Sequence, residues 1–196
     1  FAVLTTLPNV EGVRVVDLAV AEEAAQEQRV RYDKSGDNHY DVISAFIKSL
    51  RGSDADAALY WYARMVYANE NPRFIVRRLL VHASEDVGMA DPTALLMAQA
   101  AGFALEWLGM PEARIPIAQA IIYIATAPKS NSVVSAVDAA LAAVKSTGAE
   151  PVPIHLRDSH YAGAAQLGHG KGYKYPHDYP HHYVVQDYLP SNVKDL

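Results

Sequence analysis

Cysteine is absent from the 196-residue chain. This absence excludes disulfide scaffolds, thiolate zinc sites and cysteine nucleophiles, and it fits a protein of the reducing cytoplasm. No apolar run reaches the roughly 18–20 residues that cross a membrane, so we expect no membrane partner. The opening stretch FAVLTTLPNV has neither a starting Met nor a basic segment, which predicts a cut inside a longer protein rather than a signal peptide.

Positive charge is also scarce. The chain has 17 Lys and Arg against 22 Asp and Glu, for a formal net charge of −5. That balance does not favour binding of DNA by bulk charge, although a local basic patch stays open. A chain of this length buries roughly 70% of its unfolded surface, so it needs no disulfide or metal to hold a core.

Alanine, the strongest helix former, is abundant in the middle of the chain. Cap residues, helix-opening prolines and glycine stops divide residues 41–148 into five or six helices joined by short loops. The expected openings are Asp41, Asp54, Asn71-Pro72, Asp91-Pro92, Pro111, and Asn131 or Ser132. This pattern predicts an all-α bundle or helical array.

The N-terminal residues differ from this helical middle. Residues 13–18 alternate briefly between apolar and polar side chains, which predicts a short strand or hairpin. A helix is expected to follow over about residues 20–29. Residues 32–40 are polar and predict a linker.

The C-terminal part changes character from about residue 150, and Asp158 could cap only a short helix over residues 159–167. The stretch GHGKGYKYPHDYPHHY, residues 168–183, then shows no helical period. A phosphate-binding Walker A loop needs a hydroxyl residue directly after its Lys, but Gly172 follows Lys171 here. No helix is expected after it, so a tight glycine turn in an irregular tail is favoured over nucleotide binding.

The sequence offers candidate residues for two kinds of catalytic site. The side chains chemically suited to bind a metal are His177, Asp178, His181 and His182. Pro176 and Pro180 oppose the helix that would place such ligands on one face, so packing or solvent exposure is the alternative. Glu85 and Asp86 are adjacent on a helix end and point in different directions, so they are not expected to form a catalytic pair. We predict no catalytic residue in the chain.

Basic residues beside aromatic ones could hold a nucleic-acid strand through charge and stacking. The candidates for contact with DNA or a protein partner are Arg73, Arg77, Arg78, Lys129, Lys171 and Lys174. The two C-terminal lysines alternate with Tyr173 and Tyr175. The competing interpretation for the arginines is ion pairing within the protein or between subunits.

The helices also carry more large apolar residues than a single buried stripe needs, which is typical of an interface. The candidate interface residues are Tyr60, Trp61, Tyr62, Tyr67, Phe103, Trp107, Ile121, Ile122 and Tyr123, with Tyr173 and Tyr175 in the tail. A helix buried on all sides within one monomer would show the same pattern, so the sequence leaves both interpretations open.

Five blocks of sequence, in this order, carry a resemblance: YDVISAFIKSLRGSDADAALYWYARM, RFIVRRLLVHASEDVGMADP, ATAPKSNS, PIHLRD and GKGYKYPHDYP. They resemble the C-terminal part of the RarA/MgsA family of replication-associated recombination AAA+ ATPases, relatives of the clamp loaders and of the human Werner-helicase-interacting ATPase. The resemblance implies that residues 1–31 are the end of an AAA+ lid and that residues 32–40 are a linker. It makes residues 41–196 an oligomerisation domain with an irregular tail from about residue 150.

The same resemblance implies a function. The parent ATPases form tetramers and act in the bacterial cytoplasm, at the nucleoid, on DNA at stalled or damaged replication forks, with single-strand-binding protein and replisome components as partners. ATP and Mg²⁺ would bind upstream of residue 1, because no Walker A, Walker B or arginine finger can be matched here. We therefore expect a homotetrameric assembly module with no cofactor or metal of its own. The rivals are a direct DNA- or partner-binding module and a metal-dependent enzyme.

Overall fold

The computed structural model describes residue 18, residues 37–148 and residues 150–193. The strand and helix expected before residue 30, and most of the expected linker, lie outside these ranges. Within them the chain is all-α, with no strand. The six α-helices are α3 (Asp37–Arg51), α4 (Ala55–Tyr67), α5 (Pro72–His82), α6 (Thr93–Leu108), α7 (Arg114–Thr126) and α8 (Ser132–Thr147). The expectation of an all-α helical array is confirmed.

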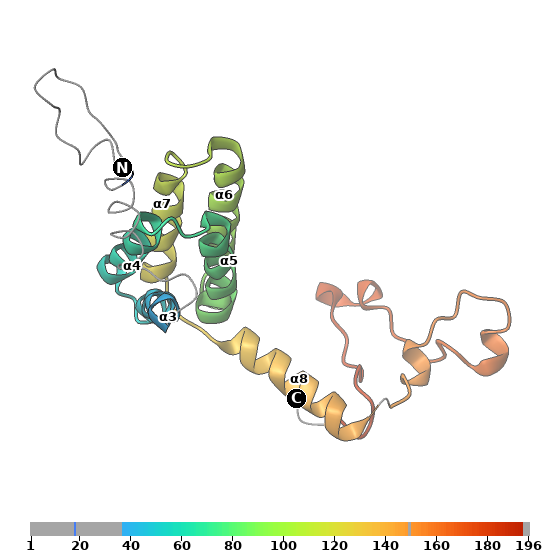
Figure 1. The fold of residues 1–196 in the computed structure, drawn as a ribbon. Coiled ribbons are helices and arrows are strands. Elements are labelled where there is room, and N and C mark those ends of the chain that lie inside the picture. Colours follow the sequence, from blue (N-terminus) through green and yellow to red (C-terminus); the bar gives the residue numbers. More distant parts are fainter. Residues whose placement is uncertain (1–17, 19–36, 149, 194–196) are drawn as a thin grey trace, which may run out of the picture. The chain divides into compact units, whose positions relative to one another are not determined.

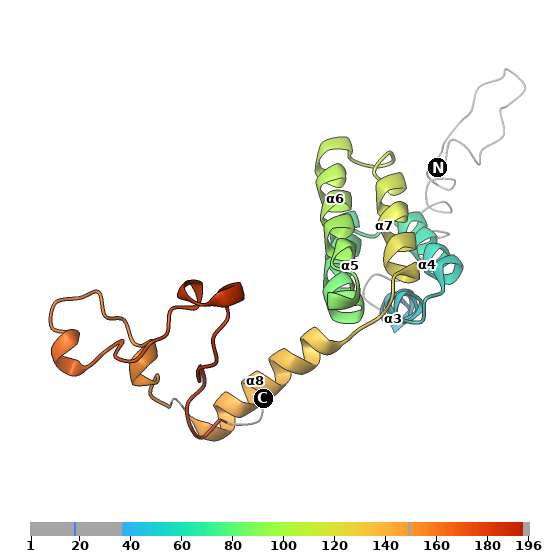
Figure 2. The same ribbon diagram turned by 180° about the vertical axis from the view of Figure 1, so that it is seen from behind.

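The chain divides into two units, and the first, which ends at Val133, contains a helical bundle. Helix α3 packs on α4, α4 on α7, α7 on α6 and α6 on α5. Both views show α5, α6 and α7 side by side along their lengths (Figures 1 and 2). The core is built from large apolar side chains that are essentially solvent-free, including Phe46, Leu79 and Ile121.

Two of the predicted helix caps are present. The Asp54 carboxylate accepts a hydrogen bond of 2.8 Å from the backbone N–H of Ala57, and the Asn71 side chain accepts one of 3.0 Å from Arg73 N–H. These bonds satisfy N–H groups that lack partners in the first turn of a helix. The cap predicted at Asp41 is wrong, because α3 begins at Asp37 and already includes His39 and Tyr40.

A π-helical turn follows α5. Residues 73–87 read as one helix, but the α-helical bonding of α5 stops at His82 and a π-helical turn, η1 (Ala83–Val87), follows. Gly88 then adopts φ +51°, and a Cβ there would lie 3.1 Å from the Ser130 carbonyl oxygen and 3.3 Å from a Val133 methyl group. The turn therefore needs glycine both for its backbone angle and for the space next to the start of α8.

The second unit, residues 134–196, is organised differently. After α8 its described part has no further α-helix, only the short 3-10 turns η3 (Ile154–Leu156), η4 (Ala165–Leu167), η5 (Pro176–Asp178) and η6 (Pro180–His182). The helix predicted over residues 159–167 is wrong, since Gly163 at φ +94° breaks it and only η4 forms. Ala164 is the one buried apolar residue in the described part of this unit.

Candidate interaction surface

Most of the predicted interface aromatics are exposed. Tyr60 and Tyr67 on α4 are more than half exposed, and Trp107 on α6 is 76% exposed. Tyr173 and Tyr175 in the tail are also exposed. Such large aromatic side chains offer the anchors that protein interfaces favour.

Other members of the predicted set belong to the core of the chain. Trp61 packs partly against the bundle, and Ile121 is fully buried. Tyr62 is 5% exposed, and its hydroxyl donates to the Arg114 carbonyl at 3.3 Å. Burial raises the pKa of Tyr62 to about 12. The structure therefore does not offer these three side chains as a free docking surface in the way that it offers Trp107.

A second exposed apolar surface, which was not predicted from the sequence, lies on α8. This helix has no buried residue, and Val137, Leu141 and Val144 are each more than half exposed. Their 3–4 spacing is visible in the sequence as an amphipathic face, but the spacing alone does not show how exposed that face is.

Two of the candidate basic residues on α5 interact within the bundle. Arg73 binds Glu106 of α6 through two hydrogen bonds of 2.7 Å each, which raise the pKa of Arg73 and lower that of Glu106. The Arg77 guanidinium lies over the Phe74 ring at 5.8 Å. Intramolecular ion pairing thus accounts for Arg73, while Arg77 keeps an exposed position.

The third α5 residue, Arg78, and Lys129 are tied more deeply into the bundle. Arg78 Nη2 lies 3.4 Å from His82 Nε2. The Lys129 ammonium donates to the carbonyl oxygens of Ile124, Ala125 and Ala127 at 3.0, 2.8 and 2.6 Å. Burial lowers the pKa of Lys129. These bonds satisfy carbonyl groups at the end of α7, so Lys129 holds a helix C-terminus.

A buried polar network that the sequence analysis did not foresee centres on Asp86 in η1. One carboxylate oxygen accepts from Arg51 Nε at 2.6 Å, and the other lies 2.6 Å from His82 Nδ1. The hydrogen bond to Asp86 raises the pKa of Arg51. His82 and Asp86 are 1% and 7% exposed, whereas the Arg51 side chain is 51% exposed, so the network ties the end of α3 to α5 and η1 where the bundle meets solvent.

The same residues form the one group of potential metal ligands found in the described part of the chain: His82, Glu85 and Asp86. Arg51 already binds both carboxylates, at 2.9 Å from Glu85 and 2.6 Å from Asp86. The Arg51 guanidinium thus balances the negative charge of these two carboxylates, as a bound metal ion would. The C-terminal set built around His177 and His182 does not form such a group. Instead these two rings pack 4.9 Å apart.

Short polar bonds, rather than a core, hold the tail loop around the glycine-rich stretch. Gln186 bonds both backbone groups of Lys174, accepting from its N–H at 3.1 Å and donating to its carbonyl at 2.7 Å. The Lys174 ammonium donates to the Val185 carbonyl at 3.2 Å. Gly170 adopts φ +74°, and a Cβ there would lie 2.9 Å from Ser159 Cβ.

The glycine-rich loop differs from the strand–loop–helix arrangement of a Walker A loop. The short turn η4 precedes Gly168, and within residues 168–193 no α-helix follows whose N-terminus could face a phosphate. The Lys174 ammonium is engaged by a carbonyl of its own chain. Lys171 is exposed in the turn and offers a single ammonium group.

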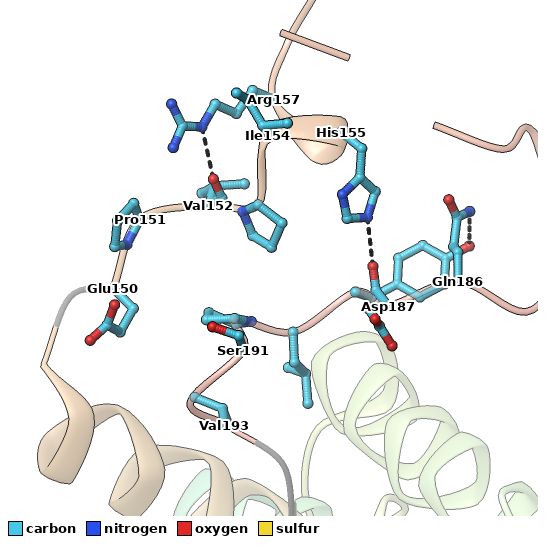
Figure 3. Close-up of a pocket in the computed structure, with 14 residues that line it drawn as sticks. Glu150, Pro151, Val152, Ile154, His155, Arg157, Gln186, Asp187, Ser191 and Val193 are labelled. Atoms are coloured by element: carbon cyan, nitrogen blue, oxygen red, sulfur yellow. Dashed lines mark hydrogen bonds between the residues drawn. The ribbon is translucent and has the colours of Figure 1, made fainter. Parts of the chain in front are cut away.

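An open groove of about 880 Å³ lies between residues 150–157 and residues 186–193. Figure 3 shows the two segments facing each other, joined by a bond of 2.7 Å between His155 Nε2 and the Asp187 carbonyl. The Arg157 Nε donates to the Val152 carbonyl at 2.8 Å and stiffens one wall. Much of the remaining lining is proline and aliphatic, including Pro151 and Leu189. The groove therefore combines apolar and polar lining residues.

Two family descriptions match the chain. The description "MgsA AAA+ ATPase C terminal" covers residues 52–196, and "AAA C-terminal domain" covers residues 1–51. The boundary between them falls at the end of α3. Among the described helices, none has the length and apolar character needed to cross a membrane.

Similar proteins are found in several bacteria. An AAA domain-containing protein of Mycobacterium tuberculosis is 53% identical over 182 residues, which are 93% of this chain and 40% of that protein. Replication-associated recombination protein A of Bacillus subtilis is 48% identical over 194 residues, covering 99% of this chain and 46% of that protein. The protein of the same name from Haemophilus influenzae is 45% identical over 186 residues, or 94% and 42%. The chain thus spans less than half of each relative.

Proposed function

Because the chain belongs to the MgsA AAA+ ATPase C-terminal family, we propose that it is the assembly module of an AAA+ ATPase of replication-associated recombination. In this proposal several copies, four in the complete assembly, associate through exposed apolar surface. ATP and Mg²⁺ bind to the part of the protein that lies outside this chain. The module holds the ATPase subunits together on DNA at stalled or damaged replication forks, in the cytoplasm.

The observation that carries the proposal is apolar exposure on two otherwise well-formed helices. Helix α8 has no buried residue, while α6 exposes Leu96, Phe103 and Trp107 between 62% and 76%. Contiguous exposed apolar surface of this kind marks a contact with another protein. Tethering several ATPase subunits also raises their effective concentration on DNA, so weak contacts of each subunit add up.

The mass of the chain in solution tests this proposal. Light scattering over a wide range of concentrations should show a species of four times 21.4 kDa that dissociates only on dilution. A mass of 21.4 kDa at every concentration would overturn the assembly role for this chain.

Direct contact with DNA or a partner, for instance single-strand-binding protein, is the second candidate. Tyr173 and Tyr175 are 44% and 53% exposed beside the exposed Lys171, and Arg77 is exposed on α5. Exposed tyrosines next to lysine can stack on bases while the charge attracts the backbone.

A charge-reversal experiment tests this second role. The double variant Arg77→Glu, Lys171→Glu should weaken binding of fluorescent single-stranded DNA by about 10-fold or more at 0.1 M salt if these residues contact phosphates. Lys48→Glu, at an exposed position of α3, is the control for a general change in charge. Equal binding by the double variant and the control would remove the DNA-contact role.

A further inference from the structure

We propose that Arg51, at the end of α3, controls the connection between α7 and α8 (residues 127–131), because it holds Asp86 in the π-helical turn η1. All of these residues belong to the first of the two units. The device operates within a single chain, so it goes beyond the proposed assembly function and does not rest on it.

The turn η1 is the element on which Arg51 acts. Single π-helical turns are rare, and unusual backbone of this kind persists only where the surrounding bonds favour it. In η1 such bonds meet at Asp86, whose carboxylate lies 2.6 Å from Arg51 Nε and 2.6 Å from His82 Nδ1. A return to α-helical bonding would change the position of Asp86 around the helix axis and, with it, the direction of its carbonyl group.

The main chain of the same residue holds the connection. Ser130 N–H donates to the Asp86 carbonyl at 2.8 Å. The connection also lies directly against the end of the turn, since a Cβ on Gly88 would be 3.1 Å from the Ser130 carbonyl oxygen. A change in the shape of η1 would therefore remove the acceptor of the Ser130 N–H.

The charge of Asp86 supports the connection a second time, through Lys129. The Lys129 ammonium donates to three carbonyl oxygens at the end of α7. Burial lowers the pKa of Lys129, and the negative charge of Asp86 acts in the opposite direction. Asp86 thus favours the charged form of Lys129, which binds the carbonyl groups at the start of the connection.

Arg51 is the partner of Asp86 that lies at the bundle surface. Its side chain is 51% exposed, whereas His82 is 1% exposed. Without the guanidinium, a carboxylate that is 7% exposed would lose the charge that balances it, and this cost favours a rearranged turn. Arg51 is also the last residue of the match to the AAA C-terminal domain. A movement at the end of that domain would therefore reach the connection through Asp86.

Hydrogen exchange followed by mass spectrometry provides the first test, on the full chain. Arg51→Met removes the guanidinium donors and keeps a long unbranched side chain. The amides of residues 127–131 and of η1 should then exchange about 10-fold faster or more, because the acceptor of Ser130 N–H moves. Amides in the middle of α7, such as that of the buried Ile121, should keep their exchange rate.

Two control variants separate this effect from a general change in charge. Lys48→Met removes another basic residue from the last turn of α3. Arg73→Met removes an arginine that binds a glutamate through two hydrogen bonds, but its partner Glu106 lies on α6. Both should leave the exchange of residues 127–131 unchanged. Equal exchange in Arg51→Met and Lys48→Met would overturn the proposal. So would an equal acceleration in the connection and in α7, since Arg51 would then stabilise the bundle as a whole.

A double variant provides the second test, because it shows whether Arg51 acts through Asp86. Asp86→Asn removes the charge and keeps the shape of the side chain, and it should also accelerate exchange of residues 127–131. The addition of Arg51→Met to Asp86→Asn should change that rate less than about 2-fold, since the two residues belong to one network. Effects that multiply in the double variant would show that Arg51 acts by another route, and the proposal would be wrong.

Discussion

Helices α7 and α8 are both rich in alanine and aliphatic residues, but they differ in burial. Helix α7 buries Ile117, Ala120, Ile121, Ile124 and Ala125 in the bundle core, whereas α8 buries nothing. The contrast extends to their surroundings. Every buried apolar residue of the described chain except Ala164 lies at or before Ala127. After α8, the rest of the described chain is held by side chain to backbone bonds such as that of His155 to Asp187.

The comparison shows that apolar spacing alone does not determine whether a helix face is buried. It also does not show which residues pack against that face. In α7 the cover comes from α4 and α6 of the same chain. In α8 no residue is buried. Three experiments would sharpen or break this distinction between a region with its own core and one without.

The largest effect is expected from Leu79→Ala. Leu79 is fully buried, so removal of its side chain should lower the free energy of unfolding by about 2–5 kcal/mol through lost burial and an internal cavity. Urea denaturation followed by circular dichroism measures the loss. Leu167→Ala, at a position 61% exposed in the tail, is the control and should cost less than about 0.5 kcal/mol. Similar losses in the two variants would mean that the tail has a core, and the comparison would fail.

An intermediate and local effect is expected from Gly170→Ala. The left-handed backbone at φ +74° costs a non-glycine residue roughly 1–2 kcal/mol, and the new Cβ also meets Ser159 Cβ at 2.9 Å. Gly172→Ala carries the same backbone strain at φ +85° but meets nothing within 4 Å. Limited proteolysis should therefore open residues 150–193 of the Gly170→Ala variant first, with the melting temperature of the bundle unchanged. Equal protection of both variants would show that the contact with Ser159 is not needed.

The smallest effect is expected from Tyr123→Phe, and it should depend on pH. The Tyr123 hydroxyl donates to the Asp91 carboxylate at 2.8 Å, which lowers the pKa of Asp91 below its ordinary 3.8. A depressed carboxyl pKa contributes stability above the unfolded pKa, and this contribution is lost as the pH falls through the folded pKa. The difference between Tyr123→Phe and the unmodified chain should therefore be full at neutral pH and shrink below about pH 4.

Urea titrations from pH 7 to pH 3 measure that difference. Tyr67→Phe, at an exposed position on α4, is the matched control and should show no such pH dependence. A Tyr123→Phe difference that stays constant down to pH 3 would contradict the role of Asp91 as the charged acceptor.

Local signals in the sequence predicted the bundle well. Asp54 and Asn71 cap their helices as expected, since a short polar side chain next to an N-terminal turn is sufficient for the bond. The five sequence blocks also identified the correct family. The π-turn after His82 was not predicted, and neither was the bond from its Asp86 to Arg51, which lies 35 residues earlier in the chain. Long-range bonds of this kind leave no periodic pattern.

Residue type alone does not show which polar side chains have partners inside the fold. Residue type selected Arg73 and Lys129 as candidates for DNA contact, but partners inside the fold engage both of them. The sequence could not supply the position of Glu106 or of the α7 carbonyls. The apolar face of α8 was missed for the opposite reason, since its spacing is the same as that of a core helix. Only the exposure of its residues distinguishes it.

Asp86 bonds two segments of the chain that are far apart in the sequence. Its carboxylate holds Arg51 at 2.6 Å, where the match to the AAA C-terminal domain ends. Its carbonyl accepts from Ser130 N–H at 2.8 Å, two residues before α8 begins. The end of α3 and the loop between α7 and α8 therefore both bond to the same residue. A substitution at Asp86 would therefore release the last residue of α3 and the loop after α7 at the same time.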